Sequence, residues 1–274
     1  MFASALQNKE RLVLAALIAT LAINGFTHDA VMKLTRENAD VLLSPVYPLV
    51  LCIALYQIIH DKSSLSHVWL GTFAVISLSV ALVPSSLIAW SVLLVLCVAS
   101  YIVDRGSRRS YLIIMGLCFV VIWRAIGLKV AGTTLYEIEA WVIAKIYSTF
   151  IGSAESIGTL ILAEGGQPLV MRRDCSAFSQ MGTVIIGFAA FYTLANGNRP
   201  FFAWWLPTLV TSIVLLNLGR LLLMAHSPET YEFAHGPDGG MIYDGLLSLL
   251  IVMGAFWPSA DTVDTENSKV GSNN

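Results

Sequence analysis

Charged residues are scarce in this chain of 274 residues, since Asp, Glu, Lys and Arg make up only 12% of it. Soluble globular domains carry about 25% charged residues, so the composition excludes that class. The hydrophobic fraction is 56% and the mean hydropathy is +0.73. We therefore predict an all-α, polytopic transmembrane helical bundle that has the lipid bilayer as its surroundings. The net charge of −2 argues against a nucleic-acid partner.

Cysteine is also rare, with Cys52, Cys97, Cys118 and Cys175 as the whole set. No paired spacing occurs, so neither a disulfide framework nor a zinc site is predicted. The first three lie inside apolar runs, where a thiol behaves as a small hydrophobic group. Cys175 differs because it follows three charged residues, 172–174, at the edge of a run.

Long apolar runs predict about eight spans, because roughly 20 residues cross a bilayer as a helix. The expected spans are 12–26, 41–59, 67–83, 87–103, 110–128, 175–194, 201–225 and 241–257. We expect one multi-pass domain over 1–258, with a catalytic half at 133–257. The polar tail 259–274 is expected to be disordered.

The segment 133–173 mixes apolar and charged residues and does not read as a clean span. It predicts a surface-lying amphipathic helix, followed by an irregular or short hairpin segment, before the sixth span. The expected apolar face consists of Tyr136, Trp141, Ile143, Ile146, Tyr147 and Phe150.

Lysine and arginine in the short loops predict the orientation, because they concentrate on the cytoplasmic side. With the N-terminus inside, the inner side holds eight of these residues and the short outer loops hold two. We therefore expect both termini to be cytoplasmic in a cell inner membrane. Cys175, Arg220 and His235 then fall on the extracytoplasmic side.

The runs 175–194 and 201–225 are joined by the short segment 195–200. If they form an antiparallel helical hairpin, Cys175 and Arg220 each lie about 22 residues from its middle, which is roughly 30 Å along the helix. That length is about one hydrocarbon thickness. The pattern predicts a thiol facing a guanidinium at one membrane surface.

Cys175 is a candidate nucleophile. The first turn of a helix and the neighbouring Arg172 and Arg173 would both favour its thiolate form. Asp174 acts in the opposite direction and could cap the helix. The alternative is that Cys175 simply packs at a helix start.

Arg220 lies within an apolar run, where a guanidinium costs at least about 2.5 kcal/mol on insertion scales. It could snorkel to the interface. Asn217 lies one turn earlier on the same helix face, however, and two polar groups on one stripe suggest a site. An arginine there can stabilise an oxyanion that develops when a thiolate attacks a carbonyl group.

A histidine could supply general acid–base catalysis, because imidazole titrates near neutral pH. His235 lies in a turn-rich loop before the last expected span. His226 is a competitor, and spacing alone does not separate the two.

Taken together, Cys175-Ser176-Ala177, then Asn217-Leu-Gly-Arg220, then His235 before a final span resemble the exosortase/archaeosortase family. The likeness covers roughly 158–256. The sequence departs from the family at Ala177, where glycine is usual, and this change could narrow the specificity.

The resemblance implies a membrane cysteine transpeptidase or peptidase that needs no cofactor. Its partners would be exported substrate proteins that end in a short motif, a transmembrane helix and a basic tail. Cys175 would form a thioester, Arg220 would hold the oxyanion or position the cysteine, and His235 would move the proton. The acceptor could be water, an amine or a lipid.

Three alternatives stay open. Arg220 and Asn217 could line the path of a transporter or channel, the same groups could serve a membrane acyltransferase acting on lipid, or all could be structural. A rhomboid-type protease is disfavoured because the sequence has no Gly-x-Ser-x-Gly element. The sequence predicts no oligomeric state.

Overall fold

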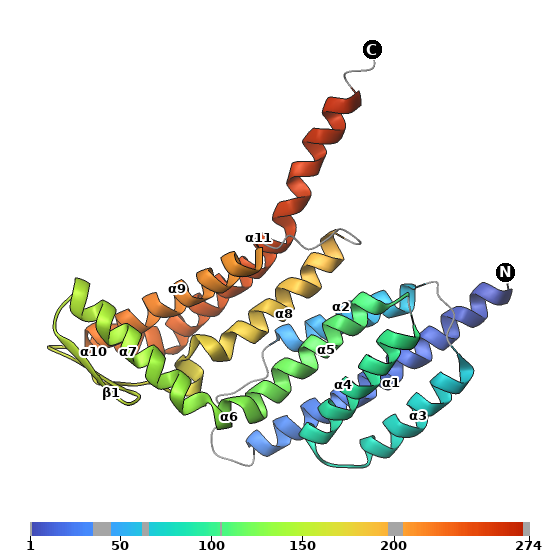
Figure 1. Cartoon of the computed structure of the whole chain (residues 1–274), viewed down its shortest axis with the longest axis horizontal. Helices are drawn as coiled ribbons and strands as arrows, with labels where there is room; N and C mark the ends of the chain where they lie inside the picture. Colours follow the sequence, from blue (N-terminus) through green and yellow to red (C-terminus); the bar gives the residue numbers. More distant parts are fainter. Residues whose placement is uncertain (1, 35–44, 62–65, 105, 197–204, 271–274) are drawn as a thin grey trace. The chain divides into compact units, whose positions relative to one another are not determined.

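The computed structural model is mostly helical (Figure 1). It describes residues 2–34, 45–61, 66–104, 106–196 and 205–270. The chain divides into two compact units, Met1–Ala125 and Ile126–Asn274. The expected catalytic half lies inside the second unit, and the single-domain assignment stays a prediction.

The first unit is built from α1 (Phe2–Leu34), α2 (Val46–His60), α3 (His67–Ala81), α4 (Ser86–Val103) and α5 (Arg108–Ile122). Helix α1 contacts α2, α3 and α4, while α5 packs against α2 and α4. Gly25 of α1 allows this packing, because a Cβ there would lie 2.6 Å from the indole nitrogen of the buried Trp90. The unit is therefore centred on α1.

A buried ion pair lies inside the first unit. Arg11 is fully buried, and its Nη1 donates a hydrogen bond of 2.6 Å to Oδ2 of Asp104. The same carboxylate oxygen accepts the Tyr111 hydroxyl at 2.9 Å. Arg11 directly precedes the first expected span, so this ion pair ties that part of α1 to the residue that follows α4.

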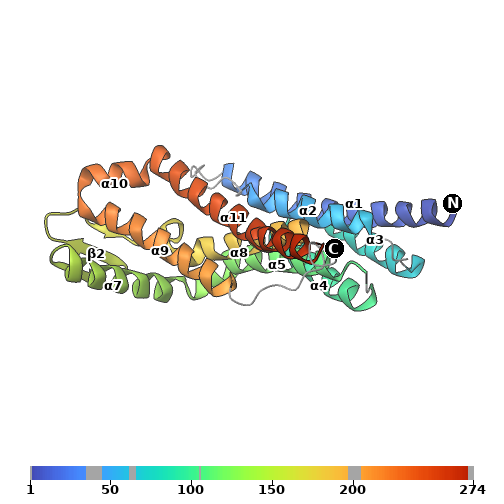
Figure 2. The same cartoon turned by 90° about the horizontal axis from the view of Figure 1, so that it is seen from above.

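The second unit follows a π-helical turn, Trp123–Gly127, that crosses the unit boundary. Its helices are α6 (Leu128–Val130), α7 (Gly132–Phe150), α8 (Ala177–Asn196), α9 (Trp205–His226), α10 (Pro228–His235) and α11 (Pro237–Val270). Helix α8 packs against α9 and α11, and α10 packs against the same two helices. Figures 1 and 2 show α7, the strands and α10 gathered at one end of this unit.

A small antiparallel sheet qualifies the all-α prediction. Strands β1 (Ala154–Ile157), β2 (Leu160–Ala163) and β3 (Leu169–Val170) pair in that order. The turns use Gly158 and Gly165 at φ angles of 59° and 72°, a region that glycine enters without steric cost. Helix α7 covers β1 and β2. The segment 133–173 thus holds one helix and a sheet, and its position at a membrane interface stays a prediction.

Six described helices are long and apolar enough to cross a membrane. They correspond to the expected spans except the second and third, where α2 and α3 are apolar but have only 15 residues each. Helix α3 ends at Ala81, earlier than expected, because Pro84 disfavours helical backbone in the residue before it. The first residues of the second expected span, 41–44, lie outside the described residues.

Helix α11 is longer than the last expected span, because it continues through 259 to Val270 instead of ending near residue 257. The disorder of the tail stays a prediction. A helix that is already formed extends with one new hydrogen bond per residue, so its continuation is far easier than its nucleation. Residues 271–274 lie outside the described part of the chain.

Candidate functional site

Cys175 lies just before α8 and not in its first turn as expected. It ends a 3₁₀ turn, Arg173–Cys175, and α8 begins at Ala177. The shift has a local cause, because the side chain of Ser176 accepts the N–H of Phe178 at 3.2 Å and so caps the helix. The side chain of Asp174, the cap expected from the sequence, lies outside the described ones.

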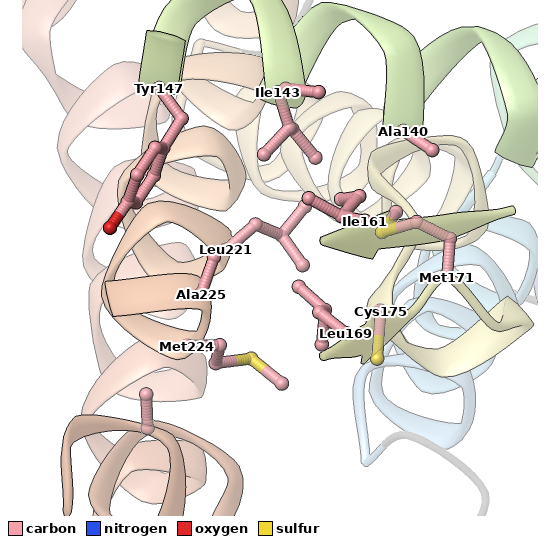
Figure 3. Packing of buried hydrophobic residues seen from close by; sticks show 12 residues of the cluster. Ala140, Ile143, Tyr147, Ile161, Leu169, Met171, Cys175, Leu221, Met224 and Ala225 are labelled. Atoms are coloured by element: carbon pink, nitrogen blue, oxygen red, sulfur yellow. The ribbon is translucent and has the colours of Figure 1, made fainter. Parts of the chain in front are cut away.

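The side chain of Cys175 is only 8% exposed, so access to its sulfur is narrow. It belongs to an apolar cluster that also contains Leu169 of β3 and Met224 of α9 (Figure 3). The cluster includes Ala234 of α10 as well. The cysteine is therefore packed where the sheet, α9 and α10 meet.

Asn217 links α9 to the backbone of Cys175. Its side-chain Nδ2 donates a hydrogen bond of 3.0 Å to the backbone carbonyl of Cys175. Its Oδ1 accepts the hydroxyl of Tyr243 at 3.3 Å. Asn217 and Tyr243 are both buried, so one amide ties the 3₁₀ turn to α9 and α11.

Arg220 lies one turn beyond Asn217 and is partly exposed. Its Nε donates a hydrogen bond of 3.1 Å to the backbone carbonyl of Ala234. Its guanidinium carbon stands 4.9 Å from the ring centre of Tyr243, a cation–π geometry. These contacts hold the guanidinium beside α10 and α11, where it approaches the residue before His235.

His235 is the last residue of α10 and is exposed. A capping box between Ser227 and Thr230 starts this short helix, and Gly236 ends it in extended backbone. The imidazole lies against the ring of Tyr231, with centroids 5.2 Å apart. His226, the competitor, is also exposed and ends α9.

The described links among the three predicted catalytic residues are indirect. The backbone of Cys175 reaches α9 through Asn217, and Arg220 reaches the residue before His235 through a carbonyl group. The structure thus brings the three chain segments together. The direct meeting of sulfur, guanidinium and imidazole stays a prediction.

The side chains expected on the apolar face of α7 divide between core and surface. Ile143 and Tyr147 are buried, whereas Trp141 is 59% and Phe150 is 80% exposed. Ala140 shares the buried face with the first two, where the helix packs against the sheet. The apolar pattern alone did not reveal which of these side chains meet the sheet.

Glu139 is a polar residue of the site that the sequence analysis missed. Its Oε1 accepts the backbone N–H of Ala177 at 2.8 Å, so it adds a second cap to α8. Burial raises the pKa of the Glu139 carboxyl, while Ser176 and the Ala177 N–H oppose this because they stabilise the ionised form. In the sequence, the available indication was an acidic residue next to Ala140 on a predicted amphipathic helix.

No group of three or more His, Cys, Asp or Glu side chains that could hold a metal ion occurs among the described residues. Comparisons of the chain with protein-family models, with curated proteins and with solved structures find no match. The functional argument therefore rests on the site itself.

Proposed function

We propose that this chain is an exosortase-like membrane cysteine transpeptidase or peptidase that removes the C-terminal sorting signal of exported proteins. The main observation in support is a pair of hydrogen bonds that two side chains of α9 donate. Asn217 binds the carbonyl of Cys175, and Arg220, one turn later, binds the carbonyl before His235. This pairing supports a site in which a thiol, a cation and an imidazole act on one peptide bond.

In the first step, the sulfur of Cys175 adds to the carbonyl carbon of the substrate, and its proton passes to His235. Arg220 stabilises the resulting oxyanion. The carbon–nitrogen bond then breaks, and the leaving amine takes the proton from His235, which leaves a thioester. In the second step, water or an amine adds to the thioester and gives a proton to His235. The carbon–sulfur bond breaks, and the sulfur of Cys175 recovers that proton.

The membrane arrangement is part of the proposal. Eight helices cross a cell inner membrane with both termini in the cytoplasm, the 15-residue helices α2 and α3 being accommodated by local thinning of the bilayer. The excess of lysine and arginine residues in the inner over the outer short loops, eight to two, supports this orientation. The site then lies at the extracytoplasmic end of α9.

Helix α7 lies along the outer interface in this arrangement. Trp141 supports that placement, because its large aromatic side chain is 59% exposed. Tryptophan is enriched at the boundary between lipid and water. An interfacial α7 would place the sheet and Cys175 next to exported substrates.

Cys175→Ala tests the nucleophile. C-terminal peptides of exported proteins that end in an apolar helix and a basic tail are mapped by mass spectrometry in cells with either chain. Cells with the unaltered chain should contain at least one such protein without its helix, and cells with the variant should retain the helix. Cys118→Ala is the matched control, because Cys118 is buried in α5 of the other unit.

Equal processing in cells with Cys175→Ala and with the unaltered chain would refute the assignment, provided that immunoblots show equal amounts in the membrane. For the general acid–base, His235→Ala should abolish processing and His226→Ala should preserve it. Loss at His226 alone would transfer the role to that residue.

A further inference from the structure

Strand β3 forms one outer edge of the small sheet in the second unit. The strand order is β1-β2-β3, so among the described residues β3 has a strand on one side only. In this pairing Leu160 lies opposite Val170, and Ile161 lies opposite Leu169. A strand at the edge of a sheet presents backbone donors and acceptors that can pair with another extended chain.

One hydrogen bond fixes the direction of the backbone groups along β3. The N–H of Met171 donates to the carbonyl of Thr159 at 2.8 Å, so Met171 directs its backbone groups toward β2. Because these groups alternate in direction along an antiparallel strand, those of Val170 point to the open edge. The β1–β2 pairing agrees, since its own alternation directs the backbone groups of Leu160 toward β1 and away from Val170.

Three backbone groups on this edge have no partner among the groups that the structure describes. Val170, which is 45% exposed, contributes its N–H and its carbonyl. Arg172 has extended backbone, with φ −124° and ψ 169°, so its N–H points to the same edge. The carbonyl of Arg172 instead accepts the N–H of Cys175 at 3.0 Å. The edge thus ends at the turn that holds the candidate nucleophile, which packs in one cluster with Leu169 of β3 (Figure 3).

We propose that this edge binds an extended segment of the substrate polypeptide as a further strand beside β3. The inference deepens the proposed function and rests on it for the link to Cys175. The peptide accepts the N–H groups of Val170 and Arg172 and donates one N–H to the Val170 carbonyl. Strand addition of this kind takes its affinity from backbone hydrogen bonds. The segment recognised is therefore extended chain and not helix, because a helix uses its backbone groups internally.

The spacing of the three groups favours a peptide over lipid. Donors and an acceptor that alternate along an extended strand are matched by the backbone of another extended chain. A phosphatidylcholine molecule has acceptors but no N–H to give to the Val170 carbonyl, so it satisfies only part of the edge. A second copy of the chain has the same backbone chemistry as a peptide, and the experiment distinguishes the two.

Val170 and Ile157 are matched positions on the two outer strands. Leu160 lies opposite both, so the three side chains share one face of the sheet. Ile157 is 60% exposed, which makes it at least as accessible as Val170. A photoreactive group at Val170 reports a chain bound beside β3, and the same group at Ile157 reports contacts at the opposite edge.

The experiment uses the full chain with Cys175→Ala in phosphatidylcholine nanodiscs, so that binding is measured without cleavage. Photoreactive p-benzoylphenylalanine replaces either Val170 or Ile157, which leaves the backbone groups in place. The probes are radiolabelled acetyl-Ser-Thr-Val-Thr-Val-Thr-Ser-amide and the same peptide N-methylated at its three central residues, which blocks N–H groups on both of its edges. The unmethylated peptide should crosslink at position 170 about tenfold more than at 157, and about tenfold more than the methylated peptide at 170, the effect of about one net hydrogen bond.

Equal labelling by the two peptides, or equal labelling at the two positions, would overturn the strand addition. Crosslinks at position 170 to phospholipid alone, or between two copies of the chain alone, would overturn it as well.

A variant of the edge itself tests the link to processing. Val170→Pro removes the N–H that points to the open edge, and proline is tolerated on edge strands. Processing in cells should fall about tenfold in this variant, whereas Val170→Thr, which keeps the N–H, should preserve it. Equal processing by Val170→Pro and the unaltered chain would overturn the edge as a substrate site. A positive crosslink in a proteome without any processing would instead refute the proposed function and leave the strand addition standing.

Discussion

Replacing Asn217 with leucine should destabilise the second unit, because its amide joins the backbone of Cys175 to α9 and to Tyr243 of α11. The substitution keeps a side chain of similar size on α9 but removes the donor to the Cys175 carbonyl and the acceptor of the Tyr243 hydroxyl. Both partner groups would then lack this buried hydrogen bond.

The magnitude follows from the two lost hydrogen bonds. The orphaned Tyr243 hydroxyl costs about 1–3 kcal/mol, and the lost bond to the Cys175 carbonyl costs about 0.5–1.5 kcal/mol. Together they predict a loss of about 1.5–4.5 kcal/mol in the free energy of unfolding. Tyr243→Phe alone removes one hydroxyl and should cost about 0.5–1.5 kcal/mol, while it keeps the ring that contacts Arg220.

A double-mutant cycle separates these contributions. The free energy of unfolding is measured by denaturation in mixed micelles, and peptide-level hydrogen exchange over 205–226 localises the effect. In the background of Asn217→Leu, the change Tyr243→Phe removes an already orphaned hydroxyl, so it should cost nothing or restore stability. We expect a coupling free energy of about 1–3 kcal/mol between the two positions.

Additive effects within about 0.5 kcal/mol would refute the reasoning, because they would mean that Asn217 and Tyr243 do not share a hydrogen bond. Unchanged hydrogen exchange over 205–226 would refute the link to Cys175 as well. Leu215→Ala serves as a control on the same helix, since that side chain is 60% exposed.

Three further predictions concern single features. Burial raises the pKa of Glu139, so the protonated carboxyl stabilises the fold below the ordinary carboxyl range, and this stability is lost as pH rises through the raised pKa. In Glu139→Gln, the free energy of unfolding should fall less over that pH range; an equal fall in both proteins would contradict the prediction. Arg11→Met should cost about 3–5 kcal/mol because it leaves the Asp104 carboxylate buried without its cation, whereas adding Asp104→Asn, which removes the charge but keeps an acceptor for the Tyr111 hydroxyl, should recover part of the loss in the same measurement. Gly239→Ala should lower the melting temperature, because its Cβ would lie 2.2 Å from a backbone carbonyl oxygen of α10. Gly240→Ala, whose Cβ would have nothing within 4 Å, should leave the melting temperature unchanged or raise it. Equal changes in melting temperature for the two variants would refute the close approach at Gly239.

The apolar runs predicted the helices well, because a span must satisfy its backbone internally and so needs a continuous apolar stretch of suitable length. Their limits were less predictable. The start of α8 moved from residue 175 to Ala177 because Ser176 and Glu139 cap it, and the second of these comes from a distant helix. Helix α3 ended early at Ala81, near Pro84.

The polar contacts were the least predictable part. Arg11 directly precedes the first apolar run, and the fold buries it against Asp104, 93 positions away. Glu139 looked like one of several charges on an amphipathic segment, although its carboxyl caps α8. Periodicity records which side chains are apolar, and it carries no information on which distant donor a carboxylate will meet.

The sequence by itself determined that the chain is helical and apolar enough for a membrane, and it singled out Cys175, Asn217, Arg220 and His235 by residue type and order. These features can be predicted from the sequence because they depend on composition and on hydrogen bonds between residues close in the chain. Only the tertiary structure decided that Asn217, and not Arg220, holds the Cys175 backbone, and that Arg220 turns toward the end of α10. Those choices depend on the rotation of α9 against its neighbours, which is set by packing between helices distant in sequence.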